Sequence, residues 1–286
     1  MSNILLAYQN RTDEGALSGG SWLASLPLVN LQNRLVQRVA RSSAATLAAT
    51  QFDMDFGSVK TIGVVALVVH NMSVGAKVRI RSDDAADFAT PTYDSGWVDV
   101  WPSGMVPQDL LEWEEDNFWL GTLSANARAG YQSPFIHVLS APQTYRYWRV
   151  EVDDTTNTDG YVQIGRLFMS ATWTPTVNYS YGAGLGYKDT SPIEKSLSGA
   201  EYFDVQTKAR EFSFTLEGLT DTEAYDVVLQ LQRVAGISGE ILQIPDLDDT
   251  TRIPARAYVG RLVDLQPIDN NQPDRFKVQL KVRELI

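Results

Sequence analysis

Short strand-like runs of apolar residues recur through the first 172 residues, and several of them alternate with polar residues. In residues 52–56 (FDMDF), phenylalanine and methionine alternate with aspartate, which predicts a strand with one buried face. Gly57 and Ser58 favour a turn at the end of this strand. Residues 62–69 (IGVVALVV) form a nearly continuous aliphatic run, typical of a strand buried on both faces, and the alternation resumes at residues 78–81 (VRIR). The pattern therefore predicts three consecutive strands between residues 51 and 84.

Two more strands are predicted at residues 147–152 (YWRVEV) and 161–171 (YVQIGRLFMSA). An eight-residue polar stretch lies between them, so we expect the two strands to pair as a hairpin. Gly, Pro, Asn and Asp separate the strand-like segments, and no long amphipathic pattern interrupts them. This arrangement predicts a sandwich of antiparallel sheets.

The C-terminal part mixes strands with one helix. Thr220 and Glu223 have the spacing of a capping box, and apolar residues follow at helical spacing up to Gly236, so we predict a helix near residues 221–235. Strands are predicted at residues 211–216, 256–265 and 276–282. In the last of these, apolar residues alternate with Lys, Gln and Arg, which gives one buried face and one cationic face.

A chain of 286 residues exceeds the usual size of a single domain, so we expect two domains. Residues 176–190 are rich in glycine and aromatic residues and are interpreted as a linker or arm. We therefore place one domain at residues 1–175 and the other at 191–286. Within the first, residues 93–135 form an insertion that holds four of the seven tryptophans, and a loop of this length usually serves a function or an interface.

Composition narrows the possible partners. The net charge of -11 argues against binding to nucleic acid or to an anionic membrane, because both recruit proteins with excess Lys and Arg. The absence of cysteine excludes disulfides, thiolate nucleophiles and cysteine-ligated metal sites. The first residues include neither a basic leader nor a long apolar run, so we expect no signal peptide, no membrane span and synthesis in a cytoplasm.

The order of several segments resembles the galactose-binding-like (discoidin-type) jelly-roll module. These segments are SLPLVNLQNRLVQRVARS, FDMDFGSVKTIGVVALVVHNMSVGAKVRIRS, YWRVEV and GYVQIGRLFM. In that family an FDLG-type strand leads into a long buried strand, and an R-V-x-V … IG-x-L hairpin closes the sandwich. The resemblance implies a mainly β fold, with an N-terminal jelly-roll β-sandwich followed by a smaller β-rich domain with one α-helix. The tryptophan-rich insertion departs from the minimal module, and no sugar-binding residue of the family can be placed in this chain.

This version of the module looks like the one in tail proteins of long-tailed bacteriophages. The segments YFDVQTKAREFSFTLEGLTDTEA, GISGEILQIPDLDD and AYVGRLVDLQPI are similar to parts of phage distal tail and baseplate proteins. The resemblance implies a structural, non-enzymatic subunit of a tail tip or baseplate, located in the virion tail after synthesis in the bacterial host cytoplasm. Expected partners are tail-tube, hub and fibre proteins, and further copies of the chain in a ring of three or six. The alternative is a carbohydrate-binding adsorption protein that recognises host surface glycans.

Residues with catalytic or metal-binding potential are few. His70 and His137 lie outside any nucleophile-elbow or catalytic-loop context, so we interpret them as structural. Residues 153–160 have oxygen-bearing side chains at alternate positions, as a calcium loop does. The final acid of such a loop is missing, so we interpret the segment as a polar turn. The acids at Glu112, Glu114, Glu115 and Asp116 are clustered within five residues of one loop, which favours a charged rim over a glycosidase pair. We expect no catalytic, metal or cofactor site, and a depolymerase is the least supported alternative.

Two sets of residues stay as candidates for contacts. The aromatic set in the insertion has three open interpretations, as a local core, as an anchor for a neighbouring subunit or as a stacking surface for sugar rings. It consists of Trp97, Trp101, Trp113, Trp119 and Tyr131. The second set is a candidate inter-subunit arm, because glycines there permit an extended chain and no helix follows to bind phosphate. It consists of Tyr179, Tyr181, Gly182, Gly184, Gly186 and Tyr187.

Overall fold

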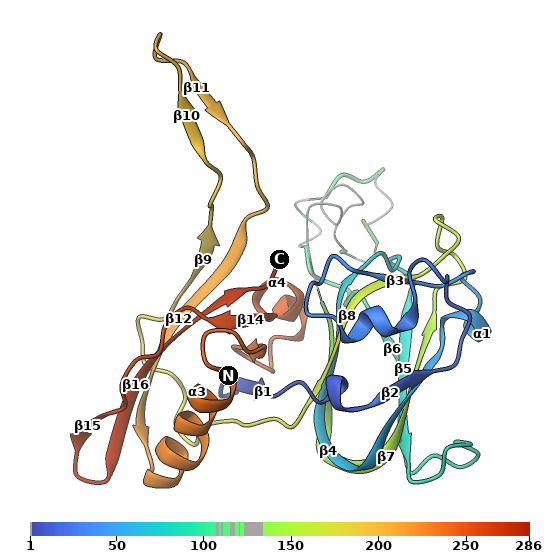
Figure 1. The fold of residues 1–286 in the computed structure, drawn as a ribbon, viewed down its shortest axis with the longest axis horizontal. Coiled ribbons are helices and arrows are strands. Elements are labelled where there is room, and N and C mark those ends of the chain that lie inside the picture. The colour runs from blue at the N-terminus through green and yellow to red at the C-terminus, as the bar shows by residue number, and fades with distance from the viewer. Residues whose placement is uncertain (1, 107–108, 110, 115–117, 120, 123–133) are drawn as a thin grey trace.

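The structure is a computed structural model that describes residues 2–106, 109, 111–114, 118–119, 121–122 and 134–286. It shows two β-sheet domains side by side and a long hairpin that projects from one of them (Figure 1). The strands are β1 (Leu5–Tyr8), β2 (Ala16–Ser18), β3 (Ala40–Arg41), β4 (Phe52–His70), β5 (Lys77–Asp83), β6 (Tyr93–Asp99), β7 (Phe135–Asp153), β8 (Gln163–Ser170), β9 (Gly184–Lys188), β10 (Ile193–Lys195), β11 (Glu201–Phe203), β12 (Ala209–Leu219), β13 (Ile241–Ile244), β14 (Tyr258–Leu262), β15 (Asp269–Gln272) and β16 (Arg275–Glu284). The helical segments are η1 (Arg11–Glu14), η2 (Leu28–Gln32), α1 (Leu47–Thr50), η4 (Glu223–Val228), α3 (Leu229–Ala235), η5 (Thr250–Arg252) and α4 (Ile253–Arg256).

The first domain is a β-sandwich folded from one continuous sheet. Its strands lie in the order β3-β8-β4-β7-β5-β6, with β2 paired to β4. β4 and β7 are each 19 residues long and pair with each other in both halves, so they run through both layers of the sandwich. β2, β5 and β6 extend one half, and β3 and β8 extend the other. Apolar side chains of the two layers enclose one core, in which Phe52 and Trp148 are fully buried. The predicted mainly β fold with an N-terminal jelly roll is confirmed.

The prediction that a strand ends at Gly57 and Ser58 is wrong. β4 continues through these residues, and its pairing with β7 shifts register just after Asp55. Gly57 has a φ of 67° and donates its backbone N–H to Asp55 Oδ1 at 2.7 Å. A glycine in this conformation produces a bulge in a continuing strand. The turn-like composition therefore marks the bend at which β4 passes from one layer to the other.

The predicted hairpin between residues 147–152 and 161–171 is also wrong. Both strands exist, as the end of β7 and as β8, but β4 lies between them and pairs with each. Residues 147–150 of β7 already have β4 on one side and β5 on the other. Because this part of β7 has no free edge, β8 begins on the far side of β4.

The prediction of a strand buried on both faces is confirmed in the middle of β4. Val65 and Leu67 point into the core of the first domain. Val64, Ala66 and Val68 point to the opposite side, into a second apolar cluster. That cluster also contains, from the other domain, Leu5, Ala7, Leu242, Ile244 and Val259. The second face of β4 is therefore covered by the sheet of the neighbouring domain.

The second domain is a sheet covered on one face by a helix. Its strands lie in the order β1-β13-β14-β16-β12-β9, with β15 paired to β16. The predicted helix is confirmed as η4, a π-helical stretch, followed by α3. The capping box at its start is confirmed as well, since Glu223 Oε2 accepts the Thr220 N–H at 3.0 Å and Thr220 Oγ1 accepts the Glu223 N–H at 3.3 Å. Strands predicted at residues 211–216, 256–265 and 276–282 correspond to β12, β14 and β16.

The N-terminal strand does not belong to the sheet of the first domain, although the predicted domain began at residue 1. β1 pairs with β13, from Leu5 opposite Ile244 to Tyr8 opposite Ile241. Leu6 and Trp173 also exchange two backbone hydrogen bonds of 2.8 Å each. The jelly roll is therefore inserted between β1 and β9 of the second domain. A four-residue strand is too short to show a period, so the sequence pattern could not indicate this pairing.

Candidate functional site

A long β-hairpin projects away from the second domain (Figure 1). At its base, β9 pairs with β12 at one edge of the sheet. Beyond the sheet the two limbs pair again as β10 and β11. The tip is closed by a backbone hydrogen bond of 2.9 Å from Ser196 N–H to Ala200 O, and Lys195 pairs with Glu201 at 2.8 Å. The sequence prediction placed the arm at residues 176–190, whereas the projecting limbs lie beyond β9.

Large apolar side chains of the hairpin and its base face solvent. They are Tyr181, Leu185, Tyr187, Ile193, Leu197, Tyr202, Phe203 and Val205. Ile193 lies directly opposite Phe203, and the two side chains are 55% and 58% exposed. Within the part of the chain that the structure describes, no third strand or helix packs against this pair. An isolated two-stranded hairpin is marginally stable in water, and an exposed apolar patch of this kind marks an interaction surface.

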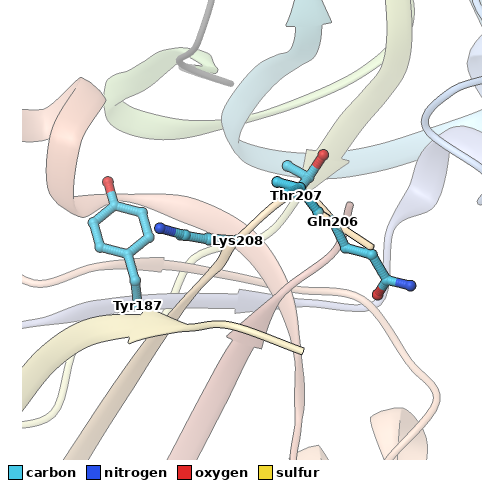
Figure 2. Close-up of a pocket in the computed structure, with 5 residues that line it drawn as sticks. Tyr187, Gln206, Thr207 and Lys208 are labelled. Atoms are coloured by element: carbon cyan, nitrogen blue, oxygen red, sulfur yellow. The ribbon is translucent and has the colours of Figure 1, made fainter. Parts of the chain in front are cut away.

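The two limbs separate between the base and the tip and leave an open hollow of about 520 Å³. It is lined by Tyr187, Val205, Gln206, Thr207 and Lys208, and Figure 2 shows the Lys208 side chain extending toward the Tyr187 ring. The Gln206 N–H donates to Ser191 Oγ at 2.9 Å, and Lys208 lies 3.7 Å from an Asp189 carboxylate oxygen. These contacts link the two limbs across the hollow.

The structure divides the residues of the predicted arm between two environments. Tyr179 packs edge-on to Phe212 and Phe214, with centroid distances of 5.7 and 6.1 Å, and belongs to the apolar cluster of the second domain. Tyr181 is fully exposed, and Gly182 next to it has a φ of 98°. The remaining three residues, Gly184, Gly186 and Tyr187, lie in β9. Tyr179 is therefore partly covered by its own domain, whereas the others are exposed.

Sequence reasoning missed the residues beyond β9. The segment IEKSLSGAEYF contains two short strand-like pieces around Ser-Leu-Ser-Gly, which is a turn sequence. Its apolar positions include Ile193, Leu197, Tyr202 and Phe203, all of which are exposed. The sequence therefore contained the pattern of a hairpin. The alternation on each limb is too short to predict a strand by itself, and only the pairing in the structure identifies it.

The tryptophan-rich insertion does not form one cluster. Trp101 is buried in the jelly-roll core and donates its Nε1–H to Met72 O at 3.1 Å, so it is not accessible to a partner. Trp97 lies on β6 with the Arg79 guanidinium 5.9 Å from its ring. Trp113 and Trp119 contact each other at 5.4 Å and are 69% and 70% exposed. Tyr131 lies outside the described residues.

The remaining polar candidates are explained by local hydrogen bonds. His70 Nδ1 accepts the Met72 N–H at 3.3 Å, and the His137 Nε2 atom lies 2.9 Å from the Tyr93 hydroxyl. Burial lowers the pKa of both histidines, that of His70 to about 4. In the loop at residues 153–160, Asn157 donates to Asp154 and accepts from the Asp159 N–H.

Three further observations concern the described residues as a set. No three or more His, Cys, Asp or Glu side chains among the described residues form a group that could hold a metal ion. No helix among them is long and apolar enough to cross a membrane. Glu112 and Glu114 of the predicted charged rim are exposed, while Glu115 and Asp116 lie outside the described part of the chain.

Comparison with known proteins gives matches only among solved structures. No family model matches the chain, and no curated protein matches it. A carbohydrate-binding module, CBM32-1 of a family 31 glycoside hydrolase from Clostridium perfringens, is 10% identical, with 57% of this chain and 99% of that chain covered and a TM-score of 0.38. The family 32 module of NanJ from C. perfringens, in complex with galactose, is 11% identical over 58% of this chain and 99% of its own, with a TM-score of 0.37. The lectin domain of lectinolysin, in complex with Lewis B antigen, is 13% identical over 56% of this chain and 95% of its own, with a TM-score of 0.36.

Proposed function

We propose that this chain is a structural protein that assembles through protein–protein contacts made by its projecting hairpin. The observation that carries this proposal is the exposure of Ile193, Tyr202 and Phe203 on a two-stranded limb with no packing partner in the described chain. Burying such side chains releases free energy of roughly 25 cal/mol per Å² of apolar surface, and a partner surface supplies that burial. A hairpin that folds against a partner also overcomes its own marginal stability.

The finer form of the proposal is a subunit of the tail tip or baseplate of a long-tailed bacteriophage. It is supported by the resemblance of the segments at residues 202–224 and 236–249 to distal tail and baseplate proteins. In this role the chain is located in the virion tail and forms a ring of three or six copies. It contacts tail-tube, hub and fibre proteins. Its jelly roll stabilises the assembly through protein contacts and performs no catalysis.

Oligomerisation of the full chain tests the proposal. We expect native mass spectrometry to show oligomers of the wild type and mainly monomer for a variant with Ile193, Tyr202 and Phe203 changed to Ser. A matched control changes Val29 and Leu35 to Ser, because these side chains are 60% and 61% exposed on the other domain. The control is expected to assemble as the wild type does. A wild type that stays monomeric over the whole concentration range, or a hairpin variant that assembles normally, would overturn the proposal.

A second candidate function is glycan binding by the first domain. Trp113, Phe118 and Trp119 support it, because their rings contact one another at 5.2–5.5 Å and the two tryptophans are exposed. Clustered rings of this kind offer the apolar faces on which sugar rings stack. The test is a glycan array that includes galactose and Lewis b structures, followed by calorimetry. Binding that is lost in Trp113→Ala and kept in the hairpin variant would establish this function, and an array without a hit would exclude it.

A further inference from the structure

The strand at the base of the hairpin is an open sheet edge. β9 is the last strand in the order of the second domain's sheet, and within the described residues nothing pairs with its outer side. The opposite edge is different, because the outer side of β1 is already hydrogen-bonded: the Leu6 and Trp173 backbones exchange two hydrogen bonds. The unpaired N–H and C=O groups of an edge strand can accept a further strand. β9 is therefore an edge at which this sheet can be extended.

β9 has few of the features by which proteins usually protect an edge. Its sequence, Gly-Leu-Gly-Tyr-Lys, contains no proline and no charge before Lys188, and its pairing with β12 is regular over five residues. Prolines, bulges, inward-pointing charges and edge lysines are common means of preventing strand addition, and of these β9 has only Lys188 at its end. The first four residues of β9 therefore leave the edge open to a further strand.

The two glycines of β9 are not required by the chain's own fold. A Cβ atom at Gly184 or Gly186 would meet nothing within 4 Å, and neither residue has a positive φ. Glycine in a strand weakens it and often occurs where another backbone approaches closely. The positions of these glycines are therefore explained by an approach from outside the chain.

The edge is complementary to a second copy of itself. If β9 pairs antiparallel with Gly186 opposite the partner's Gly186, Leu185 lies opposite the partner's Tyr187 and the reverse. Lys188 then lies opposite the partner's Gly184, so the two lysines do not oppose each other. The partner's hairpin limb runs past the exposed Tyr181. One two-fold contact thus covers apolar side chains that are exposed in the single chain.

We propose that two copies of this chain pair through β9 about a two-fold axis at Gly186, which joins their sheets into one. This proposal rests on the proposed function, because it names the partner of the same hairpin and its base. A two-fold contact presents the same surface on both subunits, whereas a ring contact presents two different surfaces. The contact is compatible with rings only when two rings stack face to face.

Single cysteines test the axis directly, because the chain contains no cysteine of its own. In the proposed register the Cα atoms of opposite residues lie about 4.5–5.5 Å apart, which is within disulfide range. Gly186→Cys is therefore expected to give a covalent dimer on mild oxidation of the full chain, read on a non-reducing gel. Gly184→Cys is the matched control. Its Cα lies about 14 Å from its symmetry mate, so its cross-linked fraction is expected to be at least about tenfold lower. Both positions have room for a side chain, so both variants are expected to fold.

The outcomes separate this proposal from the proposed function. Cross-linking through Gly186→Cys alone supports the two-fold pairing. Oligomers in native mass spectrometry without a Gly186→Cys dimer overturn the pairing and leave hairpin-driven assembly in place. Equal cross-linking of both variants, or cross-linking of Gly184→Cys alone, overturns the proposed register. A monomeric wild type overturns both proposals.

Discussion

His70 shows how a single residue can link the folding of the jelly roll to pH. It ends β4, and its imidazole lies edge-on to the Trp101 ring at a centroid distance of 5.6 Å. Burial removes water from the ring and disfavours the charged form, which lowers its pKa from 6.5 to about 4. The neutral imidazole is the form that accepts the Met72 N–H. In the unfolded chain the same side chain takes up a proton near pH 6.5.

We expect the free energy of unfolding to fall as the pH is lowered from about 6.5 to about 4, because the unfolded state then binds a proton that the folded state excludes. The contribution of His70 is complete above the unfolded pKa and is lost as the pH falls through the folded pKa. A shift of this size corresponds to at most about 3–4 kcal/mol, and to less because His70 as a whole is only half-buried. Urea unfolding of wild type and His70→Gln at pH 7 and pH 4.5 measures it. Equal losses in the two proteins would show that His70 does not carry the effect.

At the residue scale, the sequence indicated the direction of side chains in strands but not in loops. Phe52 and Met54 alternate with acids, and both are buried as that alternation predicted. Trp101 and Trp113 occur in the same insertion, yet one is buried and the other is exposed. No period relates two loop residues to a core. Their environments depend on contacts such as that of Trp101 with Met72, which only the fold supplies.

At the scale of elements, the sequence predicted the helix and its first turn because all the necessary contacts are local. Thr220 and Glu223 are three residues apart and satisfy each other's backbone N–H groups. Strand partners were harder to predict. β4 separates β7 from β8, although β7 and β8 are consecutive in the chain. Pairing between distant strands depends on which edges are already occupied, and the local pattern does not contain that information.

Thr220→Ala is expected to lower the free energy of unfolding by about 1 kcal/mol, which is the usual cost of removing an N-cap side chain. The control is Thr222→Ala, because Thr222 is exposed and makes no capping hydrogen bond with its side chain. Chemical denaturation monitored by circular dichroism compares the two variants with the wild type. If Thr222→Ala costs as much as Thr220→Ala, the capping box does not stabilise this helix.

At the scale of the whole molecule, the two domains share a core and an ion cluster. Arg166 on β8 is fully buried, and its guanidinium donates to both Asp13 and Glu240 at 2.7–3.0 Å. Glu240 precedes β13 of the second domain, so the cluster joins the two domains beside their apolar contact. The sequence predicted two domains with a linker near residue 176 and did not indicate this contact. β1 and β13 are more than 230 residues apart, and only their pairing shows that the jelly roll is an insertion.

The shared core and the buried cluster lead us to expect one cooperative unfolding transition for both domains. Glu240→Ala leaves the Arg166 charge buried with fewer partners, which is expected to cost about 3–5 kcal/mol of unfolding free energy. Lys77→Ala is the control, because it removes an exposed ion pair with Asp99 at 3.6 Å and is expected to cost less than about 1 kcal/mol. Differential scanning calorimetry measures both effects. The single transition is expected to move to lower temperature in Glu240→Ala without dividing, because the loss acts on a contact that both domains need. Two separate transitions in the wild type would show that the domains unfold independently and that their contact does not couple them.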